Sequence, residues 1–84
     1  MTYRESQRIR KTAYALAEKM IADHLGRWCE VRMKKTGAMV KVMRTGYGPM
    51  EYPERDPAEV YIGDIKVGEF DDLFAVARWM CEKY

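Results

Sequence analysis

The sequence contains few of the residues that carry out catalysis in most enzymes. It has a single serine, Ser6, and a single histidine, His24, both on one predicted helix. At 1.5 Å per residue they are about 27 Å apart, too far for a hydrogen bond between a nucleophile and a base. The segment GYG at 46–48 lacks the lysine and the helix start of a phosphate-binding loop. These absences argue against an enzyme and against a bound cofactor.

Cysteine is also scarce. Cys29 and Cys81 are too few for a disulfide framework. Zinc sites usually show pairs of closely spaced ligands such as CxxC, and no such spacing occurs in this sequence. We therefore predict that both cysteines are buried free thiols and that the chain has no metal site. His24 is expected to interact with the C-terminal carbonyls of its own helix.

Long apolar segments are absent too. No run approaches the roughly 18 apolar residues of a membrane span, and the charged N-terminus MTYRESQRIRK has no signal-peptide core. The hydrophobic fraction of 48% and the charged fraction of 33% are typical of a folded domain. The sequence thus predicts one cytoplasmic domain over 1–84 that contacts no membrane.

Charge is plentiful but unevenly divided. The net charge is only +2, yet residues 1–44 hold eleven Lys or Arg and four Asp or Glu, a net of +7. Residues 45–84 hold four Lys or Arg and nine Asp or Glu, a net of −5. This asymmetry can attract a charged partner, or it can be neutralised within the fold or in a head-to-tail oligomer.

Residue periodicity predicts an α+β fold with the order α-β-β-β-β-α. Helical spacing covers 2–26 and 70–84, while alternation predicts strands within 27–35, 38–44 and 58–70. A two-residue turn at Gly63-Asp64 divides the last of these segments into two strands. The simplest assembly is an antiparallel meander of three to four strands, with both helices packed on one face.

The ends of both predicted helices carry recognisable signals. Thr2 and Glu5 have the spacing of a capping box, and Gly26 is placed to end the first helix in a left-handed conformation. Asp71 or Asp72 can cap the second helix.

Two surfaces stand out in this predicted fold. The sheet face opposite the helices is expected to be basic, with aromatic and sulfur side chains interleaved: Trp28, Arg32, Lys34, Met39, Lys41 and Met43. The C-terminal helix is apolar over more than half of its circumference, which is more than one packing face requires. This surplus predicts a homodimer formed through Phe74, Trp79 and Met80.

Residues 45–57, TGYGPMEYPERDP, form a loop that is longer than most connections in compact domains. Its three prolines restrict the backbone, which reduces the entropy lost when the loop binds a partner. We predict that Tyr47, Met50 and Tyr52 form a contact element; in the alternative, the tyrosines fold back over the core. No rigid frame is predicted for Glu54 and Asp56 in this loop.

Six Tyr, two Trp and seven Met in 84 residues are typical of protein interfaces. The sequence therefore predicts a non-catalytic module that docks on a protein or nucleoprotein. Its small size is comparable to that of phage-encoded inhibitors of host defence, such as anti-CRISPR proteins, an analogy that suggests an inhibitor or regulator. The predicted partner-binding residues are Tyr47, Met50, Tyr52, Trp28, Arg32, Lys34 and Lys41.

The alternative function is direct binding of nucleic acid by the basic half, through Arg4, Arg8, Lys11 and Lys35. The row formed by Arg4, Arg8 and Lys11 is also what an ordinary solvated helix face would show. The order helix, sheet, helix is similar to that of double-stranded-RNA-binding domains. That family has lysines where its final helix begins, whereas this chain reads GEFDDLF there, so no RNA-binding residue is transferred.

Overall fold

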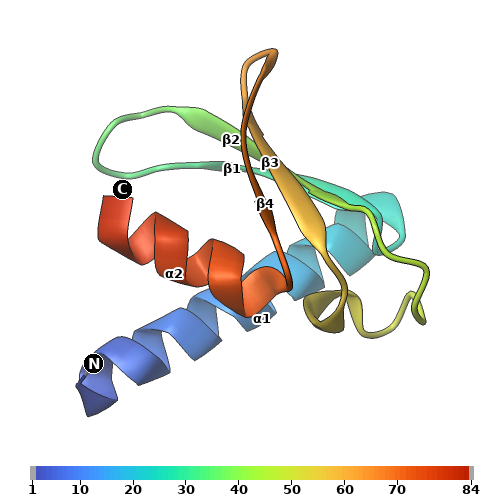
Figure 1. The fold of residues 1–84 in the computed structure, drawn as a ribbon, viewed down its shortest axis with the longest axis horizontal. Coiled ribbons are helices and arrows are strands. Elements are labelled where there is room, and N and C mark those ends of the chain that lie inside the picture. The colour runs from blue at the N-terminus through green and yellow to red at the C-terminus, as the bar shows by residue number, and fades with distance from the viewer. Residues whose placement is uncertain (1, 84) are drawn as a thin grey trace.

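A computed structural model describes residues 2–83 and confirms the α+β arrangement (Figure 1). Four antiparallel strands form one sheet, in which strands that follow one another in the chain are also neighbours in the sheet. Two helices flank it in the chain, and a short 3-10 helix, η1, lies within the long loop. The elements are α1 (Tyr3–His24), β1 (Trp28–Arg32), β2 (Met39–Arg44), η1 (Pro53–Arg55), β3 (Ala58–Ile62), β4 (Ile65–Phe70) and α2 (Leu73–Lys83).

The helix ends follow their sequence signals. At the start of α1, the Thr2 hydroxyl accepts a hydrogen bond of 3.2 Å from the Glu5 amide. At its end, Leu25 and Gly26 both have positive φ, and the Gly26 amide donates to the Met20 carbonyl at 2.8 Å. The left-handed end therefore begins one residue before the predicted glycine. In α2, the Asp72 carboxylate accepts from the Ala75 amide at 2.9 Å, which confirms this residue as the cap.

The core lies between the sheet and the two helices, which cover the same sheet face. Alternate strand residues point into it, as the period of two requires. Ala13, Leu16, Ala17 and Met20 of α1 meet the strand side chains, and α2 adds its own apolar stripe. The remaining residues of this buried cluster are Cys29, Met33, Val40, Val42, Ala58, Val60, Leu73, Val76, Ala77 and Met80.

The open sheet face differs from the expected basic surface. The register places Trp28 opposite Met43 and Lys41 opposite Tyr61, as the alternation requires. The strands β3 and β4, however, add the carboxylates of Glu59 and Glu69. Lys66 forms ion pairs with both of these carboxylates. The open face is therefore basic only over β1 and β2, and Lys34 lies in the turn after β1.

The apolar surplus predicted for α2 is absorbed by the core. Met80 is only 8% exposed, and both Phe74 and Trp79 pack against the buried cluster. The Phe74 ring meets Tyr14 edge-on with centroids 5.5 Å apart, and Trp79 lies 5.9 Å from Phe70. The exposed apolar area that motivated a homodimer is thus not found on this helix. Neither helix has the length and apolar character needed to cross a membrane within residues 2–83.

Candidate docking surface

A nearly buried arginine organises the long loop. Arg44 ends β2, its side chain is 3% exposed, and its Nε donates to the Asp56 carboxylate at 2.5 Å. The same guanidinium donates to the carbonyls of Gly48 and Pro49 and, at 2.8 Å, to the sulfur of Met50. Asp56 also accepts from the Gly48 amide at 2.9 Å. The loop therefore has a rigid frame, contrary to the expectation for its carboxylates.

The loop glycines are required by close approach rather than by backbone handedness. A Cβ atom on Gly46 or Gly48 would lie within 2.7 Å or 2.6 Å, respectively, of Asp56 side-chain atoms. Neither glycine has positive φ. At the end of α1, a Cβ on Gly26 would lie 2.6 Å from the Met50 carbonyl oxygen. Glycine thus lets the loop pack against both Asp56 and the end of the helix.

Pro53, and not a tyrosine, closes the end of the core. Pro53 is fully buried at the start of η1, which packs against both α1 and α2. Tyr47 is fully exposed, with 103% of its reference area accessible, and Tyr52 is half-exposed. The alternative in which both tyrosines cover the core is therefore wrong.

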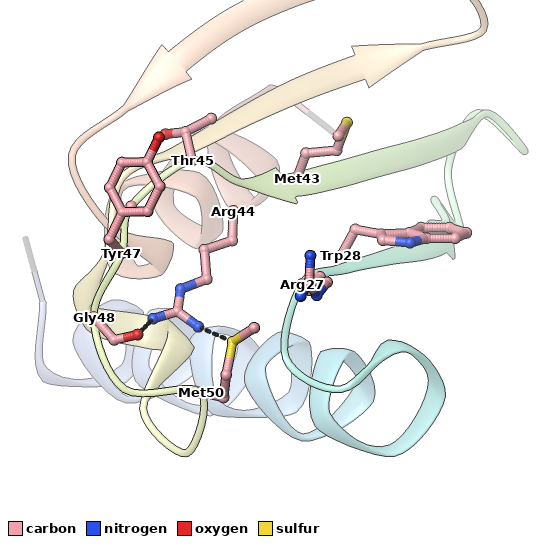
Figure 2. Close-up of a pocket in the computed structure, with 9 residues that line it drawn as sticks. Arg27, Trp28, Met43, Arg44, Thr45, Tyr47, Gly48 and Met50 are labelled. Atoms are coloured by element: carbon pink, nitrogen blue, oxygen red, sulfur yellow. Dashed lines mark hydrogen bonds between the residues drawn. The ribbon is translucent and has the colours of Figure 1, made fainter.

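Tyr47 and Met50 border an open depression of about 690 Å³ together with Trp28. Figure 2 shows Trp28 and Arg27 on one side of it and the loop with Tyr47 on the other. Met43 lies between them on β2. The sequence predicts contact roles for Trp28, Tyr47 and Met50 individually, and the fold places them on one surface.

A second, smaller depression adjoins the first. It has a volume of about 380 Å³ and is lined by Ile21, Leu25, Arg27, Met50 and Glu51. Arg27 and Met50 border both depressions, so the two depressions form one continuous surface. We call it the loop-end surface and define it by Ile21, Leu25, Arg27, Trp28, Met43, Tyr47 and Met50.

Trp28 is held in place by two neighbours. Its ring stacks on His24 with centroids 3.4 Å apart and an interplanar angle of 14°. The Lys41 ammonium lies 4.4 Å from the Trp28 ring centroid, within cation–π distance. His24 therefore supports an aromatic side chain of the surface, a role that the predicted contact with helix carbonyls did not include.

The other predicted partner-binding residues lie elsewhere. Tyr52 packs with Arg55, whose guanidinium carbon is 5.1 Å from the ring centroid. Arg32 and Lys34 line a depression of about 280 Å³ with Arg8 of α1. The fold thus separates Arg32 and Lys34, and also Tyr52, from the loop-end surface.

Neither cysteine forms a disulfide in the structure. Cys29 is fully buried, and this burial raises its pKa from 9.0 to about 12, which keeps the thiol protonated. Cys81 is partly exposed, contrary to the expectation that both are buried. Within residues 2–83, no group of three or more His, Cys, Asp or Glu side chains is arranged to hold a metal ion.

No protein-family model, curated protein or solved structure matches this chain. Its function must therefore be argued from its own residues.

Proposed function

We propose that this protein is a non-catalytic binding module that docks on a partner protein through the loop-end surface. The observation that carries the proposal is the full exposure of Tyr47 at the tip of a rigid loop. A fully exposed tyrosine buries no apolar surface when the protein folds, so it does not stabilise the fold, yet it can serve as an anchor in a protein interface. The Arg44–Asp56 pair fixes the loop beforehand, so less freedom is lost on docking.

The rest of the surface supports the same function. Leu25 is 76% exposed, and Ile21, Met43 and Met50 are each between 36% and 43% exposed. Contiguous exposed apolar residues often mark interaction sites in soluble proteins. Arg27 lies among them and forms no ion pair with any of the described residues, so it is available to a carboxylate of the partner. A partner segment with apolar side chains and an acidic residue fits this surface.

The narrower proposal, an inhibitor or regulator of a larger complex of the phage anti-defence kind, rests on analogy of size. It would require the loop-end surface to cover a functional site of that complex.

Affinity capture with matched double variants tests the docking proposal. Tyr47→Ser with Leu25→Ser removes the two most exposed apolar side chains of the surface. Tyr3→Ser with Ile65→Ser is the control, because these residues are 79% and 70% exposed but lie outside it. A partner captured from nuclease-treated lysate should bind the first variant at least about tenfold more weakly, or roughly 1.4 kcal/mol.

The control variant should retain wild-type affinity, and both variants should keep melting temperatures within a few degrees of wild type. Equal loss of the partner by both variants, or by neither, would disprove docking through the loop-end surface.

A further inference from the structure

The basic and acidic halves of the chain do not neutralise each other in the fold. Among the described residues, the Arg44–Asp56 pair alone joins a cation of residues 1–44 to a carboxylate of residues 45–84. The other ion pairs lie within one half: Lys19–Asp23, Lys66–Glu59, Lys66–Glu69 and Arg78–Glu82. Most cations of the first half are therefore left for solvent or for a partner.

These cations gather at one end of the molecule. Arg8 borders one depression with Arg32 and Lys34 and another with Arg10 and Lys11, so residues of α1 and of the β1–β2 turn share a surface. Figure 1 shows the N-terminal half of α1 and this turn on the same side, opposite the long loop. We call this surface the basic end: Arg4, Arg8, Arg10, Lys11, Arg32, Lys34 and Lys35.

The basic end carries a high local charge. Residues 4–11 and 32–35 hold seven Lys or Arg and a single carboxylate, that of Glu5, for a net charge of +6. None of the seven cations forms an ion pair with another described residue. Their clustering across two elements is not explained by neutralisation within the fold.

Helix stability does not explain the cluster either. Arg4 lies in the first turn of α1, where the helix dipole disfavours cations. Arg4 and Arg8 are spaced i,i+4, and Arg8 and Lys11 are spaced i,i+3, so each pair places like charges side by side. These arginines thus oppose folding slightly, as residues selected for binding often do.

We propose that the basic end binds the phosphate backbone of nucleic acid. Clustered Lys and Arg release counterions when they neutralise phosphates, which supplies affinity without reading sequence. The lysines of the basic end, Lys11, Lys34 and Lys35, favour phosphate over a protein partner, because protein interfaces are depleted in Lys. Because the basic end and the loop-end surface lie at opposite ends of α1, one molecule can contact nucleic acid and protein together.

Fluorescence anisotropy with a 20-base-pair DNA duplex of mixed sequence tests the proposal. The wild-type protein should lose affinity by roughly 100-fold between about 50 and 200 mM KCl if it neutralises about four phosphates. The triple variant Arg8→Gln, Arg32→Gln, Lys34→Gln should bind at least about tenfold more weakly at the lower salt. Its slope of log affinity against log salt should be smaller by about 3.

A second triple variant, Arg27→Gln, Lys41→Gln, Arg55→Gln, removes the same charge outside the basic end and should lose less than about threefold. Since Arg32 also donates to the Gly37 carbonyl, the variant Arg4→Gln with Lys11→Gln is a check that involves only the exposed face of α1. It should weaken binding while its melting temperature stays equal to or above that of wild type.

Three results would overturn the assignment. The first is equal weakening by both triple variants, which would indicate net charge alone. The second is wild-type binding weaker than about 1 mM at low salt. The third is tighter binding to polyglutamate, or to vesicles containing phosphatidylserine, than to the duplex.

Discussion

Arg44 and Asp56 form an ion pair that joins the end of β2 to the far end of the long loop, twelve positions later in the sequence. Their side chains are 3% and 15% exposed. Because Arg44 also donates to two loop carbonyls, a single side chain fixes the loop that presents Tyr47. The stability of the loop and its proposed docking function therefore depend on the same contact.

Removing the charge of Asp56 should destabilise the protein strongly. The variant Asp56→Asn leaves the Arg44 guanidinium buried without its counter-charge, a change that typically costs about 3 kcal/mol. Urea unfolding measures the difference. Lys19→Gln is the matched control, since the Lys19–Asp23 pair is almost half exposed and should contribute less than about 1 kcal/mol. Similar losses in the two variants would mean that the Arg44–Asp56 pair does not organise the fold.

Gly26→Ala should destabilise the protein more than Gly37→Ala. Both glycines have positive φ, 81° and 73°, so alanine is strained by about 1 kcal/mol at either position. Only at Gly26 would the added Cβ also meet a backbone oxygen, that of Met50, at 2.6 Å; nothing lies within 4 Å at Gly37. We expect an additional loss of about 1–2 kcal/mol at Gly26. Equal melting temperatures for the two variants would show that the loop does not pack on the end of α1.

Cys29 should make the protein less stable in alkali. The thiol has a pKa of about 12 in the folded protein against 9.0 ordinarily, because burial disfavours the thiolate. The protonated thiol contributes fully to the free energy of unfolding below about pH 9. This contribution is lost as the pH rises towards 12, because the unfolded chain then releases a proton that the folded chain retains. Between these pH values, Cys29 lowers the free energy of unfolding by up to about 1.4 kcal/mol per pH unit.

Urea unfolding at several pH values checks this effect. Cys29→Ala should be less stable near neutral pH through lost packing, but its stability should fall less steeply above about pH 9. A thiol reagent should label Cys81 in the native protein and reach Cys29 only on unfolding. Rapid labelling of both thiols would contradict the burial of Cys29.

Trp79→Glu should destabilise the packing of α2 against the core rather than dissociate a dimer. Trp79 is partly buried and packs with Phe70, so a charge there costs about 3 kcal/mol. Sedimentation and circular dichroism of wild type and variant distinguish the two effects. A wild-type dimer that becomes a well-folded monomer on this substitution would restore self-association through α2.

The order and type of the helices and strands were predictable from local sequence patterns. Helix periodicity, the cap signals at Thr2 and Asp72 and the alternation around Val40 and Val42 all act over a few residues, so they can be read without knowing the tertiary structure. The Gly63-Asp64 turn was equally local, and Gly63 has the positive φ that this turn requires.

The site was only partly predictable. Trp28, Tyr47 and Met50 were recognisable by residue type, and Met43 by strand alternation. Arg27 and Leu25 were not, because nothing in their neighbours distinguishes them from ordinary surface residues. The proposed basic end was partly recognisable as the row of cations Arg4, Arg8 and Lys11 on one helix. Its extension to Arg32 and Lys34 depended on how the β1–β2 turn packs beside α1.

The conformation of the long loop and the pairing of its charged side chains depend on tertiary packing. The chain has fifteen Lys and Arg and thirteen Asp and Glu, so Arg44 and Asp56 each have many possible partners. No local sequence pattern selects one of them. Their pairing follows from burial, because a charge removed from water is retained only where an opposite charge and hydrogen-bond partners surround it. The same three-dimensional packing buried the broad apolar surface of α2 and left Tyr47 exposed.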